Sequence, residues 1–476
     1  MAILVEDILA LACLLLQPTW PLLALASLAT TVALTSSEKL PERTGGVVFA
    51  VLLGPLLTSA YRKNAMLHAG DAAHSILWVL ASAQALGNLL VHSTVFLIAS
   101  TALAWAAGLS LWPSIVFLVV QQSCQRCRSF RSYAHCFSFA EVMFWSQSSA
   151  FLAALTTQGF RDGYDSWRPT CAFWTVLATC GLIFMLFTAC FDALAAHGFA
   201  PLLAAAATAL LFLLWGLSEQ LSDGAIWWFL GYLSQMENLW CLLFQWPLLL
   251  IAGVASIEML SRRLQVESLM KKHIVRKSFH VLAICLFAPL LMSGQADFLA
   301  LSQLVATLLF IALEVCRICK APLYEQQNKF LSKYLDKRED ISQDLVLTPL
   351  YLLLGCSLPV WLELSAASNI AVELRRWSGL LLIGLGDSCA ALFGIRFGGI
   401  KWPGSHRTLV GTAAFLLSIA CATWIFLPLE GMHWPFFLTT ALAALLEVYT
   451  NTVDNLALPL FFCTFLKALE MRQPEV

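Results

Sequence analysis

Residues 384–412 read GLGDSCAALFGIRFGGIKWPGSHRTLVGT. An aspartate, Asp387, stands near the start of this apolar stretch, small residues follow it at spacings of three and four, and a short basic turn closes it. Such spacings complete about one turn of an α-helix, so the aspartate and the small residues share one helical face. The stretch therefore predicts an apolar helix that carries a carboxylate and ends in a basic loop.

The rest of the chain has the composition of a membrane protein. Of its 476 residues, 59% are hydrophobic and only 12% are charged, and the mean hydropathy is +0.77. Because lipid cannot satisfy backbone hydrogen bonds, and because the apolar runs do not alternate with polar residues, spanning helices are expected. The predicted fold class is all-α: a polytopic bundle of about 14 transmembrane helices.

The N-terminus and the net charge each add one expectation. Glu6 and Asp7 stand where a secretory leader carries basic residues, so an uncleaved N-terminal helix is expected. The formal net charge of -1 argues against a nucleic-acid partner.

Charge divides the chain into two regions. In residues 1–257 it is confined to short connections between apolar spans, which predicts an N-terminal transmembrane scaffold. In residues 258–476 it returns in discrete blocks, and this region is expected to be catalytic. Two apolar runs, 279–295 and 298–316, separate two basic blocks, so both blocks lie on one face, which the positive-inside rule makes cytosolic.

The same count of spans brings further polar groups to that face. The next spans are expected at 344–362, in a run that ends near Gly398, at 410–428 and at 433–450. The loop 399–407 and the acids Glu447 and Asp454 would then share the cytosolic face with the basic blocks. Four polar clusters would converge on one membrane surface, as a composite site requires.

Asp387 is the residue that favours chemistry over simple packing. Small residues at four-residue spacing often serve only to pack helices in membranes, and this alternative is open. An ionised aspartate inside a bilayer costs roughly 2.5 to 3.5 kcal/mol, so it needs a cation, a polar partner or water. Mg²⁺ held by one or two carboxylates and by substrate phosphates would satisfy it.

The basic loop offers a second feature. Lys401, His406 and Arg407 alternate with glycine and proline, and Ser405 and Thr408 add hydroxyls before the next helix. A loop that opens onto a helix N-terminus suits a polyphosphate, because backbone N–H groups and the helix dipole add to the side chains. A positive-inside loop without a ligand is the open alternative. Neither a P-loop nor a complete dinucleotide-binding fingerprint occurs.

These residues carry a specific resemblance. The stretch resembles the CTP-binding motif of dolichol kinases and related polyprenol kinases, roughly D-x2-A-x3-G-x3-G-x2-[KR]-x4-KKT-x-EG, through Asp387, Ala390, Gly394, Gly398, Lys401, Arg407, Thr408 and Gly411. The segments 276–280, 351–362 and 445–460 are also similar to that family. His406 stands where the motif has a lysine and Val410 where it has a glutamate, so no metal role is implied for position 410.

The resemblance implies a reaction and its setting. The γ-phosphoryl group of CTP would pass to the terminal hydroxyl of dolichol, giving the dolichyl phosphate that carries sugars for protein glycosylation. The protein would lie in the endoplasmic reticulum membrane with its active site on the cytosolic face, and Mg²⁺ or another divalent cation would assist. Phosphoryl transfer depends mainly on positioning and charge stabilisation, which a carboxylate, cations and Mg²⁺ provide.

Roles for single residues follow from the resemblance and the spacing. Asp387 is expected to coordinate Mg²⁺ or to accept the alcohol proton, with Asp454 as a second catalytic acid and Glu447 as a metal ligand. The expected nucleotide-binding residues are Gly386, Ser388, Gly394, Gly398, Lys401, His406, Arg407, Thr408 and Lys277.

Several of these roles have open alternatives. Glu447 and Asp454, seven residues apart and on one face of an unbroken helix, would bind a second metal or order the basic loop. Asp454 would alternatively cap the following helix. Lys277 and His280, one helical turn apart, would reach the nucleotide or anchor the chain at the interface.

Three rival functions keep part of this pattern. A phytol kinase or another polyprenol kinase would share the site and differ in its lipid tunnel. A cytidylyltransferase that forms a CDP-lipid would share CTP and Mg²⁺ but attack the α-phosphorus. A transporter would use the acids to bind ions, but the acids are expected at one face and not at the midplane.

Overall fold

The computed structural model describes residues 227, 230–231, 234, 244–264, 269–318, 322, 324–332, 334, 346–364, 366, 368–427, 434–450 and 454–470. These residues form helices and their connections, and no strand occurs among them, which confirms the all-α prediction for this part of the chain. The scaffold expected in residues 1–257 lies mostly outside the described residues. The total of about 14 spans and the boundary at 257 stay predictions.

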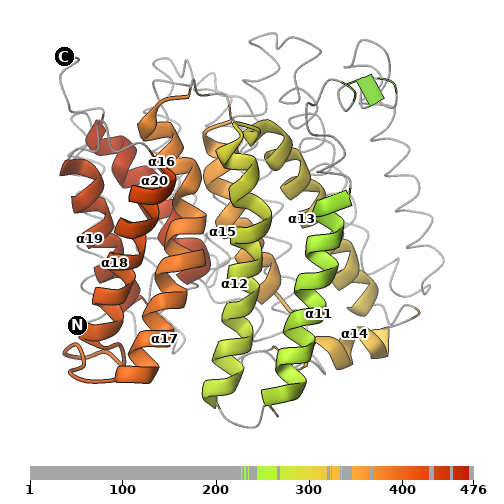
Figure 1. Cartoon of the computed structure of the whole chain (residues 1–476), viewed down its shortest axis with the longest axis horizontal. Coiled ribbons are helices and arrows are strands. Elements are labelled where there is room, and N and C mark those ends of the chain that lie inside the picture. Colours follow the sequence, from blue (N-terminus) through green and yellow to red (C-terminus); the bar gives the residue numbers. More distant parts are fainter. Residues whose placement is uncertain are drawn as a thin grey trace, which may run out of the picture. The chain divides into compact units, whose positions relative to one another are not determined.

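The described helices are labelled in chain order (Figure 1). They are α11 (Trp246–Leu264), α12 (Leu269–Met292), α13 (Ala296–Ile318), α14 (Tyr324–Leu331), α15 (Thr348–Leu362), α16 (Ile370–Gly379), the π-helix η2 (Leu380–Asp387), α17 (Ser388–Phe397), α18 (Leu409–Phe426), α19 (Trp434–Tyr449) and α20 (Asp454–Glu470).

Four described helical runs are long and apolar enough, by length and composition, to cross a membrane. They are Ile274–Met292, Ala296–Glu314, Ile370–Phe397 and Leu409–Phe426. Thr348–Leu362 and Trp434–Tyr449 are shorter apolar helices. Each of the six coincides with a span expected in the C-terminal region, so the chain is a membrane protein and the order of these helices was predicted correctly.

The described residues fall into two compact units. The core unit holds the described residues up to 400 together with 408–427, and the loop unit holds 401–407, 434–450 and 454–470.

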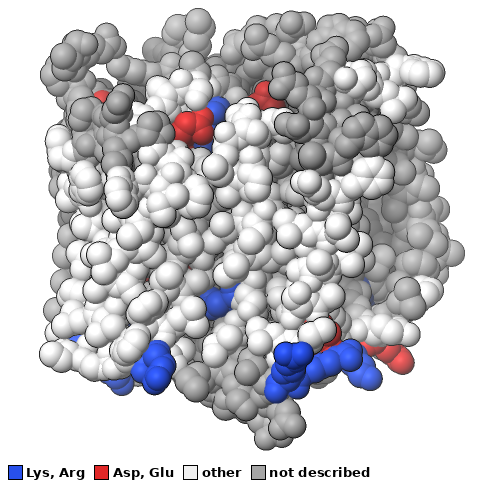
Figure 2. All heavy atoms as spheres, in the orientation of Figure 1, with Lys and Arg blue, Asp and Glu red and all other residues white. Residues whose placement is uncertain are grey.

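The basic ends of several core-unit helices lie at the same end of that unit. Arg262 and Arg263 end α11, Arg317 ends α13 and Arg396 ends α17. Figure 1 shows the basic ends of α11 and α17 at the lower edge, and Figure 2 shows basic side chains gathered below α11. This arrangement confirms that the two basic blocks share one face, and the cytosolic assignment of that face stays a prediction.

Polar contacts hold the surface helix α14 against the basic end of the core unit. Arg317 pairs with Glu314 at 2.6 Å, and its Nη1 donates to Asn328 Oδ1 of α14 at 3.3 Å. Tyr334 donates its phenol proton to Glu258 Oε2 of α11 at 2.7 Å. Burial and this bond to a carboxylate raise the pKa of Tyr334 above its ordinary value, so the phenol stays protonated and keeps donating.

The centre of the core unit is one continuous helical run made of α16, η2 and α17. It spans 28 residues, Ile370–Phe397, and begins where Asn369 accepts the Val372 N–H at 2.9 Å. Gly379 allows the run to touch α15, because a Cβ there would lie 2.6 Å from the Cα of Cys356. Close approach through glycine replaces hydrophobic driving force in membrane helix packing. This run carries Asp387 into the middle of the packed helices.

A buried ion pair joins α15 to α16 at the opposite end of the unit. Arg375 Nε lies 2.6 Å from Glu363 Oε1, and Glu363 is 0% exposed. Arg376 donates to the backbone carbonyls of Glu363 and Ala366 at 2.9 and 3.2 Å. Buried charged side chains therefore hold the polar connection between α15 and α16 in place.

Candidate active site

Asp387 is buried at the end of η2 and faces α12. The Lys277 ammonium of α12 donates to Asp387 Oδ2, although the two residues lie 110 positions apart. The exposed fractions of the two side chains are 15% for Lys277 and 3% for Asp387. Lys277 thus supplies the cation that a buried carboxylate needs, so the burial of Asp387 alone does not call for a metal.

His280 lies one turn further along α12 and also faces η2. Its Nδ1 is 3.1 Å from the Ile383 carbonyl oxygen and 3.7 Å from Asp387 Oδ2. A carbonyl oxygen only accepts, so Nδ1 carries the proton in this contact. Of the two alternatives for Lys277 and His280, the structure shows neither residue as an exposed anchor, because both side chains reach η2 and its aspartate. Contact of Lys277 with a nucleotide stays a prediction.

The neighbours of Asp387 in the chain are also buried. Ser388 is 4% exposed, and its Oγ has no hydrogen-bond partner among the described residues. Gly386 faces α18, where a Cβ would lie 2.7 Å from the Phe415 ring. Gly386 therefore lets α18 pack against η2, and the nucleotide-binding roles of Gly386 and Ser388 stay predictions.

The small residues after Asp387 pack two helices together. A Cβ at Gly394 would lie 3.0 Å from Thr408 Oγ1, and a Cβ at Gly411 would lie 3.0 Å from the Ala390 carbonyl oxygen. The packing alternative is thus confirmed for this face, and nucleotide binding by Gly394 stays a prediction. Gly398 ends α17 with a φ of 58°, a conformation that other residues rarely adopt. Nucleotide binding by Gly398 is likewise untested.

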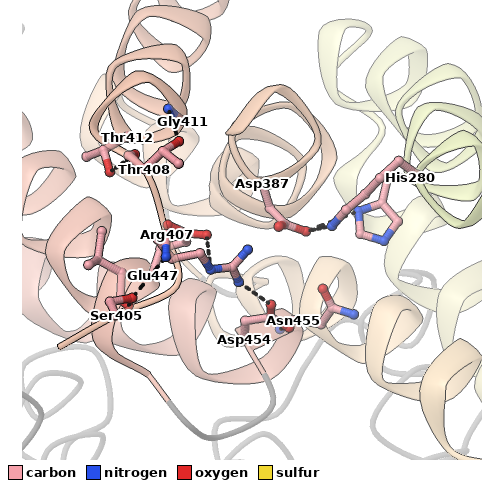
Figure 3. A network of polar contacts seen from close by, with 12 residues as sticks. His280, Asp387, Ser405, Arg407, Thr408, Gly411, Thr412, Glu447, Asp454 and Asn455 are labelled. Carbon is pink, nitrogen blue, oxygen red and sulfur yellow. Dashed lines mark hydrogen bonds and ion pairs between the residues drawn. The ribbon is translucent and has the colours of Figure 1, made fainter. Parts of the chain in front are cut away.

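In the loop unit, Arg407 joins the two acids that the sequence singled out. Its Nε lies 3.1 Å from Glu447 Oε1 and its Nη2 lies 3.6 Å from Asp454 Oδ2 (Figure 3). Ser405 Oγ donates to the Val448 carbonyl at 2.7 Å. The alternative in which Glu447 and Asp454 order the basic loop is the arrangement found.

The two acids would share one helical face only on an unbroken helix, and that condition is not met. α19 ends at Tyr449 and α20 begins at Asp454, so Glu447 and Asp454 belong to different helices. Asp454 is the first residue of α20, and its Oδ1 accepts the N–H of Asn455 at 2.8 Å. Capping of α20 by Asp454 through the N–H groups two or three residues further on stays a prediction. Catalysis by Asp454 stays a prediction, and so does the convergence of these acids with the other polar clusters on one surface.

The basic loop leaves two of its side chains in solvent. Lys401 and His406 are exposed, while the Arg407 side chain is 39% exposed. Thr408 caps α18, because its Oγ1 accepts the Gly411 N–H at 3.1 Å, and the Leu409 N–H donates to the Ile400 carbonyl at 2.9 Å. These main-chain amides already have partners, so a phosphate would rely mainly on the exposed basic side chains.

The carboxylates fit a Mg²⁺ ion in one respect. No group of three His, Cys, Asp or Glu side chains suited to a metal occurs in the described part of the chain. Mg²⁺ usually takes one or two carboxylates and completes its shell with phosphate oxygens and water. Asp387 supplies one carboxylate of this kind, and its Oδ2 accepts from Lys277 in this structure. Glu447 is engaged by Arg407, and its role as a metal ligand stays a prediction.

The Arg407–Glu447 pair predicts a measurable coupling. Glu447 is 2% exposed on its side chain, so Arg407→Met leaves a buried carboxylate with one cation fewer. We expect the free energies of unfolding of Arg407→Met, Glu447→Gln and the double variant to be non-additive by about 0.5 to 3 kcal/mol. Thermal unfolding of the full chain in detergent measures this, and strictly additive effects would show that the pair does not hold the loop.

The fold and these two clusters define a class of protein: a helical membrane protein in which an aspartate of one spanning run pairs with a lysine of another, and a basic loop pairs with two acids. The chain is similar to the dolichol kinase of Homo sapiens, with 33% identity over 258 residues, which are 51% of this chain and 47% of the human protein. It is similar to the dolichol kinase EVAN of Arabidopsis thaliana, with 32% identity over 231 residues, 46% of this chain and 39% of that protein.

A more distant relative gives the same result. The dolichol kinase of Saccharomyces cerevisiae is 28% identical over 244 residues, 49% of this chain and 43% of the yeast protein. The chain thus spans about half or less of the length of these curated relatives. No family model and no solved structure matches it. The resemblance to dolichol kinases that the motif indicated is confirmed.

Proposed function

We propose that the protein is a dolichol kinase that transfers the γ-phosphoryl group of CTP to the terminal hydroxyl of dolichol. One observation carries the proposal. Asp387, the first residue of the CTP-type motif, contacts Lys277, and each residue belongs to a different spanning helical run. A carboxylate and an ammonium held together in a low-dielectric site are the groups that phosphoryl transfer uses. The similarity to proteins named dolichol kinase supports the same reaction.

Asp387 and Lys277 have complementary tasks in this reaction. When the triphosphate binds, Lys277 exchanges its carboxylate partner for a phosphate oxygen, and Asp387 becomes free to act. The alcohol oxygen of dolichol then bonds to the γ-phosphorus, the bond between that phosphorus and the bridging oxygen of CDP breaks, and the alcohol proton passes to the Asp387 carboxylate. Mg²⁺, when bound by Asp387 and phosphate oxygens, would neutralise the charge of the transferred group.

The exposed cations of the basic loop are proposed to bind the triphosphate. Lys401 and His406 are solvent-accessible, and Arg407 is partly so. Point charges and hydrogen-bond donors of this kind bind phosphate without an elaborate fold. His406 replaces a lysine of the family motif, so its contribution depends on its charge.

The setting of the enzyme is part of the proposal. We propose an endoplasmic reticulum protein with about 14 spans, residues 1–257 as a scaffold and the active site on the cytosolic face. The clustering of basic helix ends at one end of the core unit supports a single cytosolic surface. The product, dolichyl phosphate, would serve protein glycosylation.

Purified full-length protein in liposomes tests the substrate assignment. Dolichol, phytol and diacylglycerol are each offered with CTP or ATP, and phosphorylated lipid is separated by thin-layer chromatography. We expect phosphorylation of dolichol with CTP to exceed the other combinations. A preference for phytol would transfer the assignment to another polyprenol kinase, and the absence of any phosphorylated lipid would contradict a kinase.

A further inference from the structure

The His280 ring contacts both the backbone and the side chain that define the Asp387 site. Its Nδ1 lies 3.1 Å from the Ile383 carbonyl oxygen, one helical turn before Asp387, and 3.7 Å from the Asp387 carboxylate. The ring is 8% exposed, so little water competes for these contacts. A single side chain of α12 thus bridges two points of η2 that determine where the carboxylate lies.

The helix that His280 holds has an unusual form. η2, Leu380–Asp387, is a π-helix of eight residues and ends at Asp387 itself. π-helical turns are rare, widen the helix and often mark functional sites. The Ser388 N–H already donates to the Leu385 carbonyl, three residues back, so the hydrogen-bond pattern changes at the aspartate. A helix that changes pattern at one residue needs outside contacts to fix that residue.

Gly384 lets α12 and η2 approach each other closely. A Cβ at Gly384 would lie 2.7 Å from Ile284 Cγ1 and 3.9 Å from the His280 carbonyl oxygen. The two backbones therefore approach each other beside the His280 ring. On the other side of η2, Gly386 lies against Phe415 of α18. η2 therefore packs between α12 and α18, and the hydrogen bond from His280 is a directional contact on its α12 side.

We propose that His280 is a positioning residue for phosphate transfer. Its Nδ1–H bond to the Ile383 carbonyl holds the last turn of η2, and this keeps the Asp387 carboxylate against Lys277. The link to phosphate transfer rests on the proposed function. The role does not require His280 to touch a substrate, because it acts through the backbone that carries Asp387.

Three substitutions at position 280 separate the hydrogen bond from the ring. Asn carries an amide N–H at the position of Nδ1 and keeps the donor, Leu removes it at similar volume, and Gln moves the amide one methylene further out. We expect His280→Leu and His280→Gln to lower kcat by about 100-fold, because misplacement of a reacting group by about 1 Å costs that much. The KM for CTP should change little, and His280→Asn should restore most of the rate.

Ser278→Ala is the matched control on the same helix. Ser278 Oγ bonds only to the Ile274 carbonyl of its own helix among the contacts described, so its loss should leave kcat unchanged. Equal defects in His280→Asn and His280→Leu, or a full rate in His280→Leu, would overturn the proposal. If His280→Leu does not fold, the comparison of Asn with Gln makes the same decision.

A second readout does not depend on activity. Lys277 can be modified with acetic anhydride and quantified by mass spectrometry, with exposed Lys401 as the internal reference. We expect faster modification of Lys277 in His280→Leu, as in Asp387→Asn, and the wild-type rate in His280→Asn. Unchanged Lys277 reactivity in His280→Leu would overturn the positioning role. Wild-type protein that transfers no phosphate would instead overturn the proposed function, and the labelling would still test the hold on η2.

Discussion

Asp387→Asn is expected to lower the rate of phosphate transfer from CTP to dolichol by about 100-fold or more, the range associated with loss of a positioned acid–base group. The amide cannot accept the alcohol proton and is a poor ligand for Mg²⁺. The amide is also uncharged, so Lys277 loses its carboxylate partner in a mostly buried position. Initial rates with purified protein and saturating CTP measure the effect.

The instability that this substitution causes is separable from the loss of chemistry. Breaking a buried ion pair by removing one partner costs about 3 to 5 kcal/mol, whereas removing both charges is often nearly neutral. The double variant Lys277→Met/Asp387→Asn should therefore unfold near the wild-type temperature and still be inactive. Glu325→Gln, on the exposed helix α14, is the matched acid-to-amide control and should keep full activity. Normal transfer by folded Asp387→Asn would contradict the assignment.

Glu363→Met is expected to destabilise the protein by about 3 to 5 kcal/mol, because it leaves the Arg375 guanidinium buried without its carboxylate. The pair is 2.6 Å apart, with 4% and 0% of the two side chains exposed. Loss of the pair should loosen the join between α15 and α16, which positions the run that carries Asp387. Thermal unfolding of the full chain in detergent measures the change.

Two further variants show whether burial of charge is the cause. Glu363→Met/Arg375→Met should recover most of the lost stability, since it removes both buried charges. Glu373 also pairs with an arginine, Arg376 at 2.7 Å, but its side chain is 24% exposed. Glu373→Gln should therefore cost about 1 kcal/mol or less. Equal costs for Glu363→Met and Glu373→Gln would show that burial does not determine the strength of these pairs.

Much of the described fold could be predicted from hydropathy. The spans of the C-terminal region and their alternating direction follow from apolar runs separated by charge, because a bilayer permits few backbone conformations. The π-helical form of η2 could not be predicted, since its apolar sequence LLLIGLGD also fits an α-helix. The break between α19 and α20 agrees with the span expected at 433–450 and with the alternative in which Asp454 starts a following helix.

The sequence predicted that Asp387 needs a partner, but it did not predict that Lys277 is this partner. Asp387 required a partner on energetic grounds, and Lys277 and His280 shared a helical face, but nothing in the sequence joined α12 to η2. Contacts with backbone carbonyls were harder still to predict from the sequence. The bonds from His280 to Ile383 and from Ser405 to Val448 end on groups that every residue possesses, so they leave no sequence signal.

The central claim is that this chain moves the terminal phosphate of CTP onto a polyprenol. Purified full-length protein is incubated with dolichol and with CTP labelled either at the γ-phosphate or at the α-phosphate, and the label in the lipid fraction is counted. We predict that the γ-label enters the lipid and the α-label remains in CDP. Entry of the α-label would identify a cytidylyltransferase, and a lipid fraction free of both labels would contradict the account.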